Sequence, residues 1–172
     1  AFDLASRRVV WAYEEKRNED PGPPNMRNIG AIQQFASLQM TAPDRWINAT
    51  PIVEGDRVLI TPPTTDLLVC LDRDSGRVVW EVPRKDGLFV PGVVDGVALI
   101  VGRSFVRGVR IADGKSGWKE SSIALPDGVQ PAGQGFVVPT SSSENPKHAE
   151  LHLPQAHGMV AVLDIATGRW ST

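Results

Sequence analysis

The residues of this 172-residue chain best suited to metal chemistry lie together near its C-terminal end. All three histidines, His148, His152 and His157, fall within ten residues, with Glu150 between the first two. Imidazole nitrogens and carboxylates are ligands that zinc and other transition metals accept. The spacing matches no established metal motif, and Pro154 prevents one continuous helix from carrying all three rings. Two interpretations follow, a metal site and a solvated polar loop, and the polar character of the segment favours the loop.

Other side chains offer less for catalysis. The acidic residues fall mostly at expected turns, where a carboxylate accepts hydrogen bonds from unpaired backbone N–H groups. The single cysteine, Cys70, excludes an intrachain disulfide and a Cys-x-x-Cys metal or haem site. It lies in an apolar run, where a buried structural thiol is expected. The sequence therefore nominates no catalytic residue.

The bulk composition excludes several broad classes. Hydrophobic residues make up 41% and charged residues 22% of the chain, which is typical of a folded domain. A net charge of −2 provides no general electrostatic attraction for nucleic acid. The sequence contains no run of about 18 apolar residues, which is the length that a membrane-spanning helix needs. The 16 glycines and 14 prolines favour short strands joined by many turns.

One pattern recurs along the chain: a small or apolar residue, an apolar residue, Asp, two variable residues, Ser or Thr, Gly, three variable residues and Trp. Copies lie at residues 1–11, 70–80 and 108–118, and a fourth begins at 162. Trp80 and Trp118 are 38 residues apart, close to the period of about 40–50 residues in propeller blades. The copies are imperfect. Arg7 replaces Gly, Arg110 replaces Asp, and Trp170 comes two residues early in the last copy.

Each motif position has a mechanical explanation. The Asp accepts turn N–H groups, and the Gly supplies a positive φ that a β-branched residue resists. The Trp is a flat group that fills the gap between neighbouring wedge-shaped blades and donates its N–H. The motif residues are Asp3, Trp11, Asp72, Gly76, Trp80, Gly114, Trp118, Asp164 and Gly168.

Each repeat predicts a four-stranded unit. The second copy predicts strands at 52–53, 57–60, 67–71 and 77–80, and the third ends in a strand carrying Trp118. The fourth copy predicts strands at 131–133, 135–138 and 159–163, with residues 141–157 inserted as a loop. Apolar spacing and a capping Asn28 also predict a short helix over residues 28–40. Trp46, outside the motif, is interpreted as a buried staple for this insertion, with an exposed recognition aromatic as the alternative.

The Asp-x-x-Ser/Thr-Gly-x-x-x-Trp pattern resembles the tryptophan-docking motif of the PQQ-like β-propeller repeat family. The resemblance implies an all-β fold, a partial propeller of about 3.5 four-stranded antiparallel blades with one short helical insertion. Because the first copy starts at residue 1, we expect the chain to be part of a larger ring. The expected units are a blade remnant 1–16, an insertion 17–46, and blades 47–84, 85–124 and 125–172, the last with the insertion 141–157.

The family contains both enzymes and scaffolds. Its members include quinoprotein alcohol and glucose dehydrogenases and the periplasmic lipoprotein of the outer-membrane β-barrel assembly machinery. Because every strong motif here is structural, we expect a non-catalytic scaffold or protein-interaction module, with no cofactor. The alternative is the propeller of a PQQ-dependent dehydrogenase with calcium, although no cofactor-binding residue can be transferred. The expected partners are a protein, the remaining blades of the ring or a second copy of this chain, and the expected location is periplasmic or otherwise exported.

Overall fold

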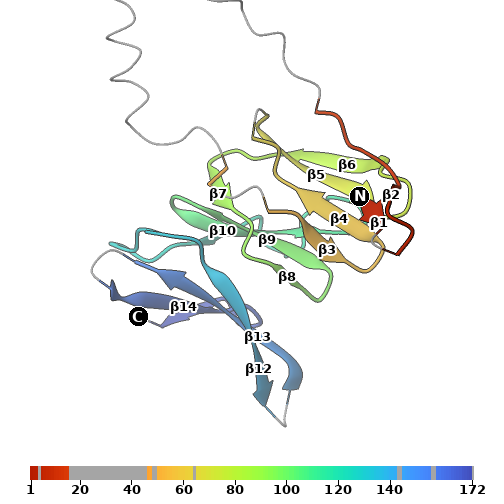
Figure 1. Ribbon diagram of the computed structural model, residues 1–172. Coiled ribbons are helices and arrows are strands. Elements are labelled where there is room, and N and C mark those ends of the chain that lie inside the picture. The colour runs from red at the N-terminus through yellow and green to blue at the C-terminus, as the bar shows by residue number, and fades with distance from the viewer. Residues whose placement is uncertain are drawn as a thin grey trace, which may run out of the picture.

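The computed structural model describes residues 1–3, 5–15, 46–47, 50–63, 65–142, 145–155 and 158–171. Within these residues the fold is all-β, and antiparallel sheets follow one another along the molecule as blades of a partial propeller (Figure 1). The predicted fold class is confirmed for this part of the chain. The helix expected over 28–40 lies outside the described residues.

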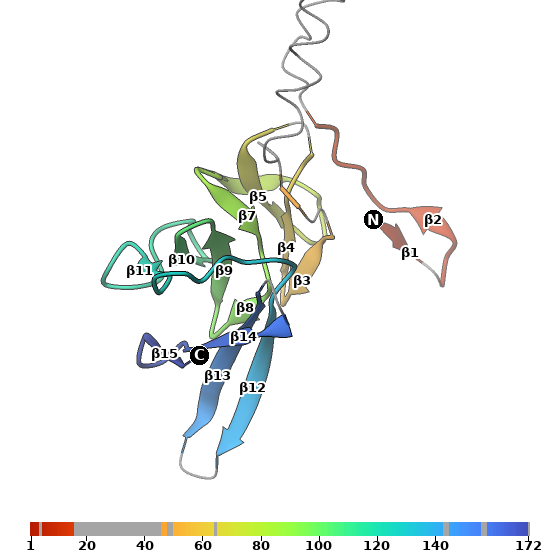
Figure 2. The same cartoon turned by 90° about the vertical axis from the view of Figure 1, so that its left-hand side faces the viewer.

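The first unit is a short hairpin. Strand β1 (Phe2–Asp3) pairs with β2 (Arg8–Val9), so that Phe2 lies opposite Val9. The hairpin projects from the body of the molecule (Figure 2). The expected division of the chain, with a blade remnant at residues 1–16, stays a prediction.

The second unit is a four-stranded meander. Its strands are β3 (Ile52–Glu54), β4 (Arg57–Ile60), β5 (Leu67–Asp72) and β6 (Val78–Pro83), paired in that order. These bounds agree with the expected strands, because each apolar run is closed by a Gly, Pro or Asp turn.

The third unit has five strands: β7 (Gly87–Phe89), β8 (Val93–Val94), β9 (Val97–Gly102), β10 (Phe105–Arg110) and β11 (Ile123–Ala124). Both β7 and β8 pair with β9, and β11 pairs with the start of β10. The expected last strand carrying Trp118 is wrong, because the last strand starts at Ile123, five residues later.

The fourth unit corrects the interpretation of residues 141–157. Its strands are β12 (Phe136–Ser142), β13 (Asn145–Pro154), β14 (Val160–Asp164) and β15 (Arg169–Ser171), paired in that order. Most of the expected loop is therefore β13, a strand of the blade itself. The expected strand at 131–133 is reduced to one bridge between Pro131 and Gln155.

The alternation along β13 explains this correction. Ala149, Leu151 and Leu153 are buried, while the residues between them, Glu150 and His152, are half-buried. A period of two is typical of a strand with one covered face. The histidines hide this period, because their polarity suggests a loop.

Apolar clusters join neighbouring blades. Between the second and third units, Leu59, Leu68 and Cys70 pack with Ala98 and Ile100. A further cluster joins the third unit to the fourth and includes Phe89, Leu99, Val101, Leu151, Leu153 and Leu163. Burying a Leu or Phe side chain of this kind stabilises the fold by about 1.5–3 kcal/mol.

Trp46 belongs to the first of these interblade clusters. It is buried, and its Nε1 donates a hydrogen bond to the Leu67 carbonyl at 2.9 Å. The interpretation of Trp46 as an exposed recognition aromatic is therefore wrong.

None of the described residues forms a helix long and apolar enough to span a membrane.

Candidate functional site

The repeated Asp is the hydrogen-bond acceptor at the centre of the turn in the copies that have it. Asp72 Oδ1 accepts hydrogen bonds from the Ser75 N–H at 2.8 Å and the Ser75 hydroxyl at 2.6 Å. Asp164 likewise accepts the Thr167 hydroxyl at 2.7 Å. The serine hydroxyls first, and backbone N–H groups second, lower the pKa of Asp3 and Asp72 below the usual range. The expected role of these carboxylates as turn caps agrees with this geometry.

The fourth turn position after Asp has a left-handed backbone in every copy. The φ angles are 70° at Gly76, 72° at Gly114 and 68° at Gly168. Arg7, which replaces Gly in the first copy, has a φ of 56°. The first copy therefore keeps the turn although a side chain there is strained.

The third copy replaces the capping Asp by a salt bridge. Arg110 stands at the Asp position, and Asp113 stands at the Ser position. The guanidinium contacts the carboxylate twice, Nε to Oδ1 at 3.0 Å and Nη2 to Oδ2 at 2.6 Å. Arg110 is the main cause of the lowered pKa of Asp113. The carboxylate lies three residues later in this turn than in the other copies, and it still links the two ends of the turn.

Two motif tryptophans join one blade to the next. Trp11 Nε1 donates to the Arg73 carbonyl at 2.7 Å, and Trp80 Nε1 donates to the Ile111 carbonyl at 2.7 Å. The two acceptor residues, Arg73 and Ile111, each directly follow the Asp position of the motif in the next blade. The two joints are therefore equivalent. Each indole also lies against the turn glycine of that next blade, Trp11 against Gly76 and Trp80 against Gly114.

The joint between the third and fourth blades is built differently. Trp118 packs over Gly108 of its own blade, where an added Cβ would lie 3.0 Å from the indole. At Gly168, the turn glycine of the fourth blade, the contact comes from Ile123 and not from Trp118. Trp170 of the fourth blade donates its Nε1–H backward to the Ala124 carbonyl at 3.0 Å. The direction of docking is therefore reversed at this joint.

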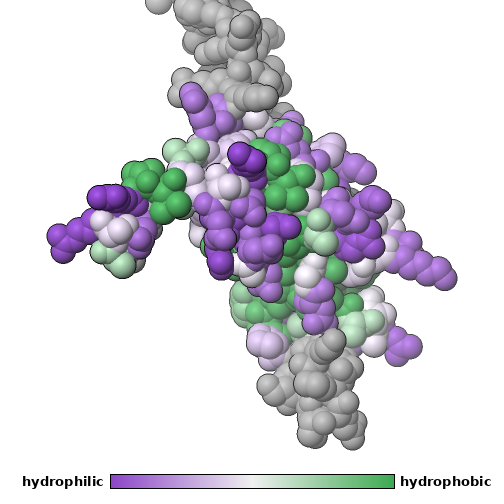
Figure 3. All heavy atoms as spheres, turned by 90° about the vertical axis from the view of Figure 1, so that its right-hand side faces the viewer, coloured by the Kyte–Doolittle hydropathy of each residue, from purple (hydrophilic) through white to green (hydrophobic). Residues whose placement is uncertain are grey.

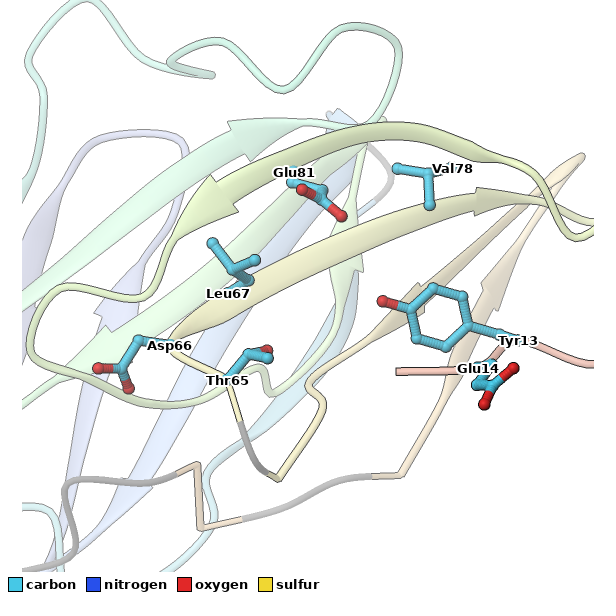
Figure 4. Close-up of a pocket in the computed structure, with 7 residues that line it drawn as sticks. All are labelled: Tyr13, Glu14, Thr65, Asp66, Leu67, Val78 and Glu81. Carbon is cyan, nitrogen blue, oxygen red and sulfur yellow. The ribbon is translucent and has the colours of Figure 1, made fainter. Parts of the chain in front are cut away.

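A cleft lies beside the first joint, between the segment after Trp11 and strands β5 and β6 (Figure 4). Its lining residues are Tyr13, Glu14, Thr65, Asp66, Leu67, Val78 and Glu81. The Tyr13 ring extends toward the two strands, while Glu81 points into the same space from β6 and Asp66 points away (Figure 4). Burial first, and the negative charge of Glu81 second, raise the pKa of Tyr13.

A β-bulge in β6 explains the position of Glu81. Cys70 pairs with Trp80, whereas the next residue, Leu71, pairs with Val78, so β6 contains one extra residue. Opposed residues share a face of the sheet. Val78 and Glu81 therefore share the face that meets Tyr13, and Trp80 faces the next blade.

An apolar groove adjoins this cleft through Tyr13. The other residues that line it include Trp11, Val53, Val58, Ile60 and Leu71. Val53 remains 60% exposed in the groove. Figure 3 views the molecule from this side, with the β1–β2 hairpin projecting at the left and apolar and hydrophilic atoms interleaved on the body.

Comparison with known proteins identifies the family. The family described as outer membrane protein assembly factor BamB matches residues 1–171. The chain belongs to the BamB family. Among solved structures, the chain is similar to BamB from Moraxella catarrhalis, with 19% identity and a TM-score of 0.48 over 71% of this chain and 34% of that one. The chain thus spans about a third of the length of that structure. Among curated proteins, none matches it.

The histidines of this BamB-family chain are only partly brought together. His148 and His152 both lie on β13, whereas His157 lies outside the described residues. His152 Nε2 is 3.1 Å from Glu150 Oε2, and its ring stacks on Phe136 with centroids 5.5 Å apart. No group of three His, Cys, Asp or Glu side chains that could hold a metal is found among the described residues. A site that includes His148 and His157 stays a prediction.

Cys70 is the buried structural thiol that its apolar run predicts. It is fully buried between the second and third blades, and burial raises its pKa to about 11.

The residues of the cleft were missed at the sequence level. Tyr13 follows Trp11 by two positions, so alternation along an extended segment could have placed both rings on one side. Glu81 could not have been found in this way. Its direction depends on a bulge that no local pattern in β6 indicates.

Proposed function

We propose that this chain is part of a non-catalytic propeller scaffold that binds another protein during the assembly of outer membrane proteins. The observation that carries the proposal is membership of the BamB family over residues 1–171. The strongly patterned residues support it, because Asp, Gly and Trp act in turns and interblade joints, which are structural roles. We also propose an exported, periplasmic location.

The proposal concerns a longer protein, because the chain spans about a third of the similar BamB structure. We propose that the remaining blades of the ring are its first partner. The exposed edges and clefts of the blades would then recruit the second partner, a separate protein. A second copy of the chain is an alternative occupant, and sedimentation of the purified protein distinguishes it.

Gene deletion in the source organism tests the function. The expected result is a lower amount of folded outer membrane β-barrel proteins, measured by heat-modifiable migration on gels, with recovery when the full-length gene is returned. Unchanged amounts in the deletion strain would overturn the proposal. A version of the full-length gene without an export signal is the control for location. It should not restore the amounts of folded outer membrane β-barrel proteins.

The dehydrogenase alternative is tested on the full-length protein. A ligand that binds only the folded state raises the melting temperature. If the protein is a scaffold without a quinone site, saturating PQQ and calcium should therefore leave its melting temperature unchanged. A rise in melting temperature together with alcohol or glucose oxidation would favour the enzyme.

A further inference from the structure

We propose that the cleft between Tyr13 and strand β6 binds an arginine side chain of the protein partner. The inference rests on the proposed function, because it names a surface and a partner chemistry for the scaffold. The occupant is an extended segment with an arginine beside apolar residues. The three features that carry it are a free carboxylate, an aromatic ring and apolar walls in one cleft.

Charge complementarity selects a cation. Glu81 points into the cleft (Figure 4), and no ion-pair partner for it is found among the described residues. Glu14 adds a second carboxylate at the rim. The guanidinium of Arg84 contacts another lining residue, Asp66, with Nε 2.9 Å from Oδ1, and donates to the Gly87 carbonyl, so it is already committed. The cleft therefore presents unbalanced negative charge.

The shape of the cleft suits a guanidinium more than a bare ammonium. The Tyr13 ring provides a face on which a planar cation stacks. A guanidinium carries five N–H donors in a fixed fork that matches the two oxygens of a carboxylate such as that of Glu81.

Apolar side chains suit the rest of the partner segment. Leu67 and Val78 line the cleft, and the methylene stem of an arginine packs on such surfaces. Val78 is 46% exposed, and its neighbour on β6, Val79, is 40% exposed. Apolar residues next to the arginine would cover these two valines.

The cleft is also preorganised. The hydrogen bond from Trp11 to the Arg73 carbonyl fixes the segment that carries Tyr13. The bulge opposite Cys70 and Leu71 fixes the direction of Glu81. Less conformational entropy is therefore lost when a partner binds.

A peptide titration tests the site on the full-length protein. The probe is a hexapeptide with an arginine between two valines, and its partner probe carries citrulline, which has the same shape without the charge. Tyr13 is the only tyrosine in the chain. The difference in phenolate absorbance between the full-length protein and its Tyr13→Phe variant therefore reports on the cleft. The arginine peptide should lower the pKa of Tyr13, and the citrulline peptide should not.

Two variants make the result specific. Glu81→Gln should weaken binding of the arginine peptide about tenfold, while the exposed Glu120→Gln in the third blade should leave it unchanged. Circular dichroism checks that both variants fold. Equal binding of the two peptides, or equal affinity of Glu81→Gln and the unsubstituted protein, would overturn the proposal.

The outcomes separate the site from the function. If deletion lowers outer membrane proteins but the peptide does not bind at Tyr13, the function stands and the arginine site fails. If the peptide binds in this way but deletion has no effect, the site stands and the proposed function fails.

Discussion

Trp11 lies against Gly76 so closely that a Cβ at position 76 would be 2.5 Å from the indole carbons Cδ2 and Cε3. The same glycine has a φ of 70°. Two independent constraints, backbone conformation and space, therefore require glycine here. At Gly114 the second constraint is looser, because the nearest Trp80 atom would be 3.0 Å away.

Gly76→Ala separates these two constraints when it is compared with Gly96→Ala. Gly96 has a similar φ of 73°, but nothing lies within 4 Å of its added Cβ. We expect Gly96→Ala to lower the free energy of unfolding by about 1–2 kcal/mol, from backbone strain alone. Gly76→Ala should lower it by about 2–4 kcal/mol, because the clash with Trp11 is added. Urea titrations measure both, and equal losses would contradict the packing role of Gly76.

Trp80→Phe tests the hydrogen bond of the second joint. The substitution keeps an aromatic ring but leaves the Ile111 carbonyl without its 2.7 Å indole donor. We expect a loss of about 1–2 kcal/mol in the free energy of unfolding. Trp118→Phe is the matched control, because no hydrogen bond from the Trp118 indole is found among the described residues. Its loss in the free energy of unfolding should be smaller. A larger loss for Trp118→Phe would mean that ring packing, not the indole N–H, dominates.

The turns could be predicted from the sequence because their requirements are local. An Asp, a hydroxyl and a glycine within five residues form the same turn wherever a strand ends, as at Asp72 and Asp164. The joint between the third and fourth blades could not be predicted. The reversed docking of Trp170 on Ala124 depends on how two whole sheets meet, and the motif spacing does not report that contact.

Strand β13 shows why the polar insertion was misinterpreted. Its buried positions, Ala149, Leu151 and Leu153, alternate as in any half-covered strand. Histidine and glutamate between them made the segment polar on average, and an average conceals a period of two. The cleft at Glu81 depends on a bulge, which is a tertiary feature of the β5–β6 pair.

The Arg110–Asp113 pair should be exchangeable for the cap of the other repeats. Arg110→Asp alone places two carboxylates in one turn, so we expect a lower melting temperature. Combining Arg110→Asp with Asp113→Ser recreates the Asp and Ser of the second repeat and should recover most of that loss. Differential scanning calorimetry of the two variants checks the order. A double variant no more stable than the single one would show that the turns are not equivalent.

The capping carboxylates should contribute to acid unfolding. Asp72 has a folded pKa below its usual value of 3.8, chiefly because of the Ser75 hydroxyl. Its stabilisation is therefore complete above the unfolded pKa and is lost as the pH falls through the folded pKa. Asp72→Asn should be less stable than the unsubstituted protein at neutral pH, and this difference should shrink as the pH falls below 3.8. Urea midpoints across the acid range measure the difference, and a gap independent of pH would contradict ionisation as the cause.

Cys70 should be unreactive until the second and third blades separate. Burial raises its pKa from 9.0 to about 11, so the folded state binds the thiol proton more tightly than the unfolded state does. The stabilisation from the neutral thiol is complete below pH 9.0 and is lost as the pH rises through about 11. Because Cys70 is the only cysteine, modification by a disulfide reagent at pH 8 should be slow in buffer and fast in urea. Equal rates in the two conditions would show that the interface between these blades opens readily in the native protein.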